Sequence, residues 1–463
     1  MYYRLDPSFA LRSWNRVPYA LLRKDAIDAD VVDEGTFRIL CSCDGKTDIP
    51  TGRTVQRLLA AGIIRRCEYG GGDPTQWQQL RWYDNRYFPA VCWSITERCN
   101  FDCRHCFVGA GSADDAPCFT YAEAMAFLEA CEQCGIHAFV LTGGEPLMHP
   151  DFLNILQEIY RRNMHVYMVN TNGSFITPDL LGHMKDIGCI PHLKISFDGI
   201  GRHDWLRRSS GAEQQVLRAI ELSTAEGFPV TVQMNVFPGN LDCLEETLVC
   251  LENAGVQETR LIRTADAPKW NKNSDGSVLS FTEYFDAMLG LLDSFVRQQH
   301  RMGLDIWRFV RLDPSQKQYR ISAIKHAECY SGKLPLCEGN RHMLSVTANG
   351  DMVPCHSFSG LYRTQGISLG NVKTQPLGAL LTKSPYLDAV CETLDGLARQ
   401  NHQCGRCRYF RYCCGGCRAM AALYGNTYFA SDPMMCCFFQ NRYDRKIRSL
   451  LPLWQDTLYT DIP

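Results

Sequence analysis

The middle of the chain alternates short apolar runs with longer stretches in which apolar residues recur every three or four positions. The short runs end at Gly or Asn and predict strands over 90–96, 137–144, 165–173, 191–199, 228–236 and 258–263. The longer stretches predict helices over 121–135, 151–163, 177–188, 212–227 and 241–255. This alternation predicts an α/β fold with a parallel sheet and outer helices. Because there are fewer strand–helix units than in a closed eight-stranded barrel, we expect an open partial (β/α)6 barrel.

The residues before this region follow a different pattern, in which short amphipathic helices stand between strand-like runs. We expect a strand over 19–24, helices over 33–43 and 51–62, and a strand over 63–69. The second helix is expected to begin at Thr51 and to end at Gly62. Short helices followed by strands predict a small winged-helix-like unit over residues 1–88.

Composition narrows the functional class. The chain has 463 residues and a net charge of −2, which predicts about three domains and no broad basic surface for nucleic acid or membranes. The N-terminal residues lack the order of a signal peptide, and no apolar run approaches the length of a membrane span. We therefore expect a cytoplasmic protein. In such a chain, 24 cysteines predict metal binding or redox chemistry rather than disulfides.

Three of these cysteines lie together in the loop after the first predicted strand of the barrel. Cys99, Cys103 and Cys106 lie within "TERCNFDCRHCF", at the edge of the sheet where sites form in such folds. A cubane iron–sulfur cluster has four irons, so three thiolates leave one iron free to bind a small molecule. The alternative is a zinc site in which His105 is the fourth ligand.

The Cys-x3-Cys-x2-Cys spacing after this strand resembles the radical S-adenosylmethionine (SAM) superfamily. Further segments match the family along the core: "GGEP" (143–146), "NTNG" (170–173), "SFDG" (196–199) and "HDWLR" (203–207). The resemblance implies that Gly143, Gly144, Glu145 and Pro146 hold the methionine amino group of SAM. It also implies that Ser196 and Arg207 contact the ribose or carboxylate of SAM, and that Asn172 and Asn235 contribute to the same pocket.

The C-terminal third carries a second set of cysteines. Cys337 is followed by twelve residues, Gly350, four residues and Cys355, and "CGRCRYFRYCCGGC" comes later. These spacings resemble the SPASM domain of radical SAM enzymes, which holds two auxiliary iron–sulfur clusters. The resemblance implies an outer cluster on Cys404, Cys407, Cys413 and Cys436, and an inner cluster on Cys337, Cys355 and Cys417. Cys414 and Cys437 are alternatives to Cys413 and Cys436, and the fourth inner position belongs to Cys329 or is open to substrate. A zinc ribbon-like module is the alternative for the whole set.

The pattern of residues 1–88 is similar to the PqqD-like recognition domain of peptide-modifying radical SAM enzymes. Such domains bind the leader of a precursor peptide as an added strand. DNA binding is disfavoured because basic and acidic residues are nearly balanced here, and a purely structural cap is the remaining alternative. We therefore expect a recognition domain (1–88), a radical SAM core (89–300), a connector (301–335) and a SPASM domain (336–463).

The resemblance implies an enzyme with three [4Fe–4S] clusters that reductively cleaves SAM to methionine and a 5′-deoxyadenosyl radical. The radical would take a hydrogen atom from a ribosomally made peptide, giving a thioether or carbon cross-link. The implied partners are a precursor peptide with its leader and a flavodoxin- or ferredoxin-type electron donor. One rival is an anaerobic sulfatase-maturating enzyme, which forms formylglycine. A rival of another class is a non-enzymatic electron carrier or peptide-binding scaffold.

One residue separates the first two enzyme readings. In sulfatase-maturating enzymes the residue after the second SPASM cysteine is typically an Asp that acts as the base. Here His356 follows Cys355. Histidine is able to act as a base because its ordinary pKa is near 6.5, so His356 is the candidate catalytic residue. Packing beside the inner cluster is its alternative role. Because the usual Asp is missing, we expect a peptide cross-link rather than formylglycine.

Overall fold

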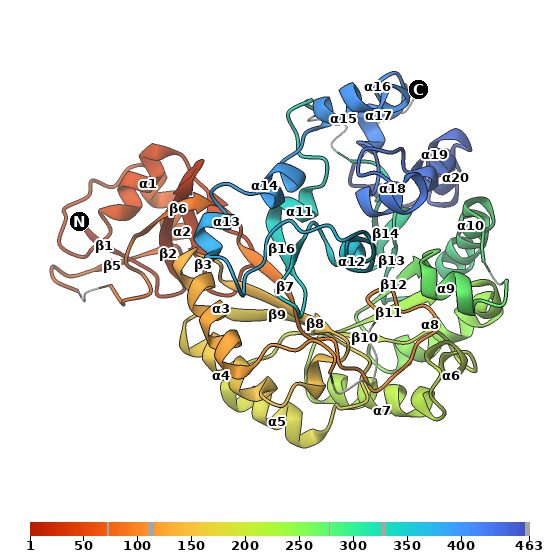
Figure 1. Cartoon of the computed structure of the whole chain (residues 1–463). Coiled ribbons are helices and arrows are strands. Elements are labelled where there is room, and N and C mark those ends of the chain that lie inside the picture. Colours follow the sequence, from red (N-terminus) through yellow and green to blue (C-terminus); the bar gives the residue numbers. More distant parts are fainter. Residues whose placement is uncertain (72–73, 110–114, 277, 326–329, 459–463) are drawn as a thin grey trace.

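The computed structural model describes residues 1–71, 74–109, 115–276, 278–325 and 330–458. Figure 1 shows a small N-terminal unit beside a strongly curved sheet, with the C-terminal helices above the open side of the curve. Within these described ranges, no helix is both long and apolar enough to cross a membrane.

The N-terminal unit contains two small sheets and two helices. Its elements are β1 (Tyr2–Leu5), β2 (Phe9–Asn15), β3 (Val17–Arg23), β4 (Asp30–Val31), α1 (Glu34–Cys41), α2 (Arg53–Ala60), β5 (Ile64–Cys67) and β6 (Arg81–Arg86). β1 pairs with β5 in antiparallel orientation, and the second sheet has the order β4-β3-β2-β6. β1, β2, β4 and β6 were not predicted. The predicted start of the second helix at Thr51 is wrong, because Gly52 is the N-cap and the Thr51 hydroxyl lies 2.9 Å from that of Tyr3.

This unit packs directly onto the barrel. The indole Nε1 of Trp14 donates a hydrogen bond to the carbonyl oxygen of Cys134, at the end of α3 (Tyr121–Gln133), at 3.1 Å. Gly135 follows with a φ of +76°, and a Cβ on it would lie 2.5 Å from Trp14 Nε1. Only glycine combines this backbone conformation with such a close approach. The N-terminal unit is therefore seated against the C-terminal end of α3.

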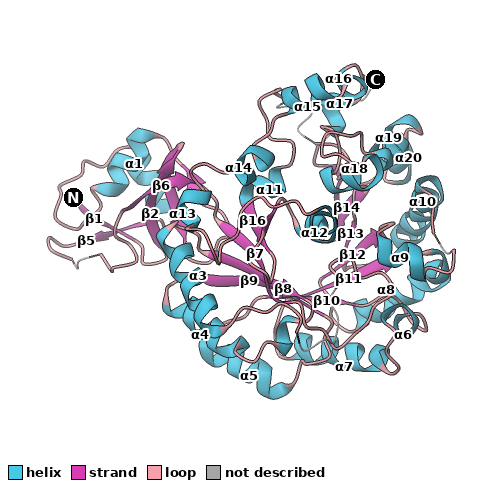
Figure 2. Cartoon of the chain, viewed as in Figure 1, coloured by secondary structure: helices cyan, strands magenta, loops and turns pink. Residues whose placement is uncertain are grey.

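The predicted strands and helices of the core are all present, and the predicted α/β fold class is confirmed. The strands are β7 (Ala90–Thr96), β8 (Ala138–Gly143), β9 (His165–Thr171), β10 (His192–Ser196), β11 (Val230–Val236) and β12 (Glu258–Arg263). The elements between and after them are α3, η1 (Pro146–Met148), α4 (Phe152–Arg161), α5 (Pro178–Ile187), α6 (His203–Arg207), α7 (Ala212–Ala225), η2 (Pro238–Cys243), α8 (Leu244–Asn253), α9 (Pro268–Asn273) and α10 (Phe281–Arg297). β7 to β12 are parallel neighbours in chain order, and the helices lie outside them (Figure 2).

The sheet extends beyond the predicted six strands at both ends. β13 (Gly303–Ile306), β14 (Val310–Asp313), β15 (Gln318–Arg320) and β18 (Gln455–Asp456) follow β12, whereas β16 (Met343–Val346) and β17 (Met352–Val353) lie beside β7. The segment predicted as a connector, 301–335, therefore contributes β13 to β15 to the main sheet. β16 runs parallel to β7, so part of the predicted SPASM region continues the barrel.

The remaining C-terminal elements are short helices. They are α11 (Glu338–His342), η3 (His356–Phe358), α12 (Ser359–Gln365), α13 (Leu377–Leu380), α14 (Pro385–Val390), α15 (Leu394–Gln400), α16 (His402–Gly405), α17 (Phe410–Cys413), α18 (Arg418–Gly425), α19 (Pro433–Gln440) and α20 (Tyr443–Leu450).

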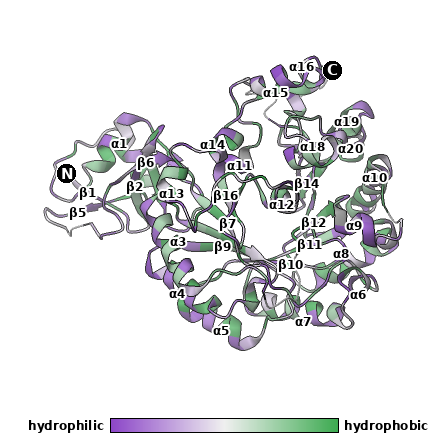
Figure 3. Ribbon diagram, in the orientation of Figure 1, coloured by the Kyte–Doolittle hydropathy of each residue, from purple (hydrophilic) through white to green (hydrophobic). Residues whose placement is uncertain are grey.

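The two faces of the barrel sheet differ in burial. On β10, Leu193 and Ile195 are buried in the main hydrophobic core, whereas Lys194 and Ser196 alternate with them and are partly exposed. The outer helices carry the matching pattern, with hydrophilic faces turned away from the sheet (Figure 3). The core therefore lies between strands and helices, and the carboxyl ends of the strands are left to form a site.

Candidate active site

The three-cysteine loop is fastened to the barrel by the region around α6. Cys99 and Cys103 are buried, Cys106 is partly buried, and all three belong to one small cluster with Phe101. The guanidinium of Arg104 stacks over the Trp205 ring at 4.3 Å, and the Arg104 amide donates to the Leu206 carbonyl oxygen at 2.9 Å. The loop thus brings the three predicted ligands together in a fixed conformation.

Positions 143 and 144 must be glycine because the backbone here touches the start of the cysteine loop. The amides of Gly144 and Glu145 donate to the carbonyl oxygens of Thr96 and Arg98, both at 2.8 Å. A Cβ on Gly143 would lie 2.0 Å from Thr96 O, and one on Gly144 would lie 2.3 Å from Arg98 O. These glycines therefore let two strand ends meet backbone to backbone, a requirement that their spacing in the sequence did not reveal. Both stay partly exposed, so a ligand is able to approach them.

Glu145 joins the second strand end to the third. Its carboxylate is fully buried and accepts hydrogen bonds from the Thr171 hydroxyl and the Asn172 amide, both at 2.7 Å, and from the Leu147 amide at 3.1 Å. Burial raises the pKa of Glu145 to about 7, against the effect of these hydrogen bonds. The neighbouring Pro146 is also buried and begins η1. In this structure Glu145 therefore holds the "GGEP" and "NTNG" segments together.

Asn172 carries this connection on to the cysteine loop. Its side-chain amide donates to Asn100 Oδ1 at 2.8 Å and lies 4.0 Å from the Cys99 sulfur. Its Oδ1 accepts from the Ser174 amide at 2.9 Å. Asn172 therefore lies next to the predicted cluster, as expected for a residue of the same pocket.

A buried ion pair at the end of β10 was missed in the sequence analysis. Asp198 is fully buried and accepts from Arg207 Nε at 2.6 Å and from the Asn235 amide at 3.0 Å. Burial alone would raise the pKa of Asp198, but the Arg207 charge and the His203 hydrogen bond hold it well below its usual range. The quoted "SFDG" segment contained this residue, yet only its pairing in space identifies it as an anchor.

Arg207 and Ser196 occupy different positions in this arrangement. Arg207 is buried, and its Nη1 donates to the Cys103 sulfur at 3.7 Å, so it links the ion pair to the cysteine loop. Ser196 ends β10 and is partly exposed on the inner face. Their contacts with SAM remain predictions.

His105 is turned toward the protein. The Asn235 side-chain amide lies 3.0 Å from His105 Nε2 and 3.2 Å from Asp198 Oδ1, to which it donates. Burial lowers the pKa of His105 to about 3, so the ring is neutral. Among the described residues, no three Cys, His, Asp or Glu side chains lie close enough to hold a single metal ion. Because Asn235 lies at hydrogen-bond distance from His105 Nε2, this nitrogen is not free to complete a zinc site, whereas His105 Nδ1 is buried without a partner.

The residues present fit a cluster with an open iron. Three thiols from one loop gather beside a cationic donor, Arg207, which suits an anionic cluster–thiolate group. The partly exposed backbone of Gly143 and Gly144 lies next to them. The three cysteines would hold the cluster, and these strand ends would hold SAM.

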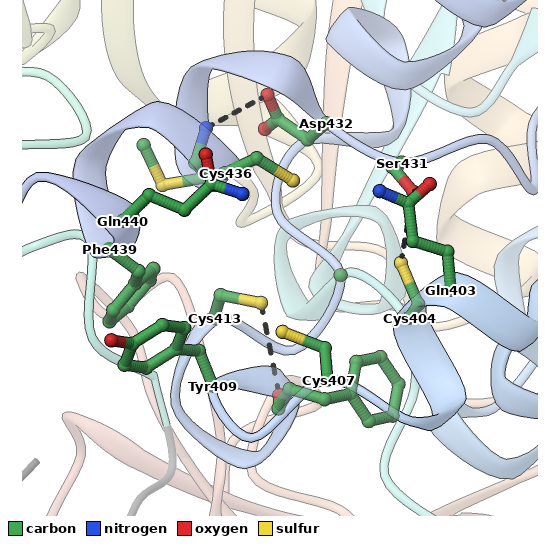
Figure 4. Close-up of a pocket in the computed structure, with 13 residues that line it drawn as sticks. Gln403, Cys404, Cys407, Tyr409, Cys413, Ser431, Asp432, Cys436, Phe439 and Gln440 are labelled. Carbon is green, nitrogen blue, oxygen red and sulfur yellow. Dashed lines mark hydrogen bonds between the residues drawn. The ribbon is translucent and has the colours of Figure 1, made fainter. Parts of the chain in front are cut away.

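Four of the C-terminal cysteines surround one cavity. The thiols of Cys404, Cys407, Cys413 and Cys436 line a space of about 70 Å³ and point into it from different elements (Figure 4). The side chain of Asp432 caps α19 by accepting from the Met434 amide at 2.9 Å, which orients the helix that carries Cys436. Four thiols around one cavity fit a cubane cluster, in which each iron takes one protein thiolate.

The neighbouring cysteines point elsewhere. Cys437 lies 3.5 Å from the Thr282 hydroxyl on α10, outside the cavity. Cys414 donates to the Arg411 carbonyl oxygen at 3.7 Å and is not among the residues that line the cavity. Of each adjacent pair, the structure therefore directs Cys413 and Cys436 to the site.

The remaining predicted ligands form a second group, which we call the inner cysteine group: Cys337, Cys355 and Cys417. Burial is the main reason that the pKa of Cys355 is raised to about 12. The charges of Cys417 and Cys337 raise it further, so Cys355 lies near both of these cysteines. The guanidinium of Arg308 lies within range of the charges of Cys417 and Cys337, and its Nη1 is buried without a hydrogen-bond partner. A cationic donor with an unpartnered nitrogen beside two of these thiols fits an anionic cluster at this position. Cys329, the candidate fourth ligand, lies outside the described residues.

His356 is held between two groups of β7. Its Nε2 lies 3.0 Å from the Cys92 carbonyl oxygen and donates to it, and its Nδ1 lies 3.5 Å from the Ser94 hydroxyl. Burial lowers the pKa of His356. The role of base predicted for His356 remains a prediction, and this geometry accounts for the residue as a packing group.

Comparison with known families agrees with this geometry. Residues 93–251 match the model described as the radical SAM superfamily, and residues 337–408 match SPASM, described as an iron-sulfur cluster-binding domain. The protein is therefore an enzyme with a radical SAM fold and a SPASM domain. These domains imply [4Fe–4S] clusters and SAM as cofactors, as predicted.

Individual relatives differ in what they act on. The chain is 25% identical to an AdoMet-dependent heme synthase of Methanosarcina barkeri, over 74% of this chain and 95% of that protein. It is 22% identical to a PqqA peptide cyclase of Gluconobacter oxydans, over 76% of this chain and 90% of that protein.

Among solved structures, Streptococcus suis SuiB bound to its precursor peptide SuiA has a TM-score of 0.63 at 12% identity, covering 94% of this chain and 99% of that one. Native anSMEcpe with AdoMet and the Cp18Cys peptide has a TM-score of 0.58 at 18% identity, covering 79% of this chain and 99% of that one. At these identities the likeness establishes the fold.

Proposed function

We propose that this radical SAM enzyme oxidatively modifies a ribosomally made peptide whose leader binds to residues 1–88. The observation that carries the proposal is the N-terminal unit, which has its own hydrophobic core and an unpaired strand edge. When bound, the cluster and SAM supply the radical that takes a hydrogen atom from the substrate. The chain itself supplies fixed strand ends around them, through the buried contacts of Glu145 and Asp198.

We assign the cysteines accordingly. Cys99, Cys103 and Cys106 would hold the SAM-binding cluster, with Gly143 to Pro146, Asn172, Ser196, Arg207 and Asn235 around SAM. Cys404, Cys407, Cys413 and Cys436 would hold the outer auxiliary cluster, and Cys337, Cys355 and Cys417 the inner one.

The free edge lies on β5, and the register identifies its outward-facing groups. The Gly45 amide donates to the Tyr3 carbonyl oxygen, so Tyr3 faces away from β5 and the adjacent Arg4 faces toward it. Because Arg4 is paired with Arg65, the amide and carbonyl of Arg66 face away from β1. No other described strand pairs there. A leader peptide in extended conformation would bond to these groups as an added strand.

The extent of the structural likeness supports a recognition role for this unit. A match over 94% of the chain includes most of residues 1–88, and the matching SuiB structure contains a precursor peptide. A balanced set of charges on the unit favours peptide over nucleic acid.

Two other substrates compete with this proposal. A sulfatase-type peptide is disfavoured because His356 replaces the usual Asp and both ring nitrogens face β7. A tetrapyrrole is suggested by the heme synthase relatives, which match about three quarters of the chain. Neither substrate accounts for the N-terminal unit with its free strand edge.

The deciding experiment is anaerobic co-expression of the enzyme with a precursor peptide encoded beside its gene, followed by mass spectrometry. We expect loss of two hydrogen atoms from the peptide and missing fragment ions across the new ring. The matched control replaces Cys99, Cys103 and Cys106 with Ala, which should abolish both SAM cleavage and the mass change. Conversion of a sulfatase cysteine to an aldehyde, or a change in the mass of a tetrapyrrole with the peptide unchanged, would contradict the proposal.

A further inference from the structure

Two basic side chains, Arg308 and Lys325, lie beside the inner cysteine group. The guanidinium of Arg308 lies within range of the charges of Cys417 and Cys337. The ammonium of Lys325 lies within range of the charges of Cys337, Cys414 and Cys417, and it donates to the Gly416 carbonyl oxygen at 3.1 Å. Neither side chain forms an ion pair with a carboxylate of the described residues.

The backbone holds Arg308 toward these thiols against its local preference. Arg308 lies in the turn between β13 and β14 with a φ of 62°, a left-handed conformation that is unfavourable for a residue with a Cβ. Its guanidinium lies 5.2 Å from the centre of the Trp307 ring, and its Nη1 is buried without a hydrogen-bond partner. A strained turn that holds an incompletely bonded cation near the Cys417 and Cys337 thiols is consistent with a functional position.

Within the described part of the chain, two cations face a single nearby carboxylate here, so one positive charge is left without a counter-charge. The carboxylate whose charge acts on Arg308 is that of Asp432. Its oxygens also accept hydrogen bonds from the amides of Cys417 at 2.7 Å and Met434 at 2.9 Å. Burial and the charge of Arg308 both lower the pKa of Lys325, so the two cations repel each other. Like charges held close together in a protein interior require an anion nearby. A cluster bound by the three thiolates would be that anion.

We propose that Arg308 and Lys325 raise the reduction potential of the inner auxiliary cluster. Reduction adds one electron, and one negative charge, to the cluster without a proton. Both cations stabilise the reduced form more than the oxidised form, because the interaction grows with the charge of the cluster. The proposal rests on the cysteine assignment of the proposed function and is independent of the peptide substrate.

The test is a reductive titration of the reconstituted full-length enzyme with dithionite, followed by electron paramagnetic resonance. The component that is absent in a Cys355→Ser variant identifies the inner cluster, and the other two clusters are internal controls. The variants Arg308→Gln and Lys325→Gln remove charge, whereas Arg308→Lys and Lys325→Arg keep it. Lys446→Gln is the matched control, since Lys446 is half-exposed over the Tyr443 ring in the same region.

We expect each neutral variant to lower the reduced-to-oxidised ratio of the inner cluster about tenfold at a fixed potential. For one electron this corresponds to about 59 mV toward more negative potential. The charge-keeping variants and Lys446→Gln should leave the ratio within about twofold of the wild type. Equal shifts in neutral and charge-keeping variants, or no shift in either, would overturn the proposal.

Loss of the cluster is also informative. If only the neutral variants fail to assemble the inner cluster, the charge requirement is supported, whereas failure of all four variants means that the two residues act through packing. If Cys355→Ser removes no component, the cysteine assignment is wrong. The redox titration does not use the peptide substrate. The proposal about the cluster potential can therefore hold even if the enzyme modifies no peptide.

Discussion

Asp198 and Arg207 form a buried ion pair in which Arg207 Nε lies 2.6 Å from Asp198 Oδ2. The pair connects the end of β10 to the cysteine loop, because Arg207 also donates to the Cys103 sulfur. Its members are nine residues apart in the chain, yet they join three segments that surround the candidate SAM pocket.

Replacing Asp198 with Asn should destabilise the enzyme strongly. The change leaves the Arg207 charge buried without its counter-ion, for which we expect a loss of about 3–5 kcal/mol in the free energy of unfolding. Chemical denaturation of the anaerobic protein measures this loss. The control is Asp242→Asn, which breaks the exposed Arg202–Asp242 pair and should leave stability nearly unchanged. Equal effects of the two substitutions would contradict the anchoring role.

The outer cysteine site makes a prediction about adjacent residues. With three complete clusters the enzyme should hold roughly twelve irons per chain, and Cys436→Ser should remove roughly four. Cys437→Ser should keep the full iron content, because Cys437 lies beside Thr282 and outside the cavity. Iron analysis after anaerobic reconstitution distinguishes the two variants. Iron loss in Cys437→Ser alone would reverse the assignment.

Glu145 should produce a characteristic pH dependence. Its folded-state pKa is about 7, above the ordinary value of 4.5, because the carboxyl is buried. Between these values the unfolded chain loses the proton while the folded chain keeps it, so stability falls as pH rises and then levels off above pH 7. Relative to Glu145→Gln, the wild type should lose about 2 kcal/mol between about pH 5.5 and 7. Thermal unfolding across this range provides the measurement, and parallel profiles would show that Glu145 does not titrate there.

The β5 edge predicts a difference between two substitutions at one position. Arg66→Pro removes the outward-facing amide without disturbing the pairing with β1, and should weaken binding of the precursor leader at least tenfold. Arg66→Ala removes the same side chain but keeps the amide, and should bind the leader far more tightly than the proline variant. Fluorescence anisotropy with a labelled leader peptide measures both affinities. Uncoupled SAM cleavage should stay unchanged in both variants, and equal affinities would exclude strand addition at this edge.

His356→Gln tests whether His356 acts as a base or as a packing group. Its hydrogen bond to the Cys92 carbonyl oxygen is one that a Gln side-chain amide is able to replace. We expect the rate of product formation to change less than about fivefold and SAM cleavage to be unaffected, because both ring nitrogens of His356 face groups of β7 and burial lowers its pKa below the ordinary value. A large loss of product with intact SAM cleavage would establish the catalytic role instead.

The sequence by itself determined the barrel strands, the outer helices and the three groups of cysteines. The core residues Leu193 and Ile195 alternate with the partly exposed residues Lys194 and Ser196, because successive side chains of a strand point to opposite faces of the sheet. This period of two is visible in the sequence without a structure. The candidate ligands of the SAM-binding cluster were equally visible in the sequence, because Cys99, Cys103 and Cys106 lie on one short loop.

The tertiary structure decided which atoms meet. Gly143 and Gly144 serve a backbone contact with Thr96 and Arg98, which lie on another strand end and are far apart from them in the sequence. Cys436 and Cys437 are indistinguishable by spacing, and only the direction of each side chain on α19 separates them. The sheet joins β13 to β15 and β16 to the barrel because strand pairing depends on long-range hydrogen bonds, which local periodicity does not encode. The positions of Asp198 and Arg308 depend in the same way on partners that the fold alone brings near.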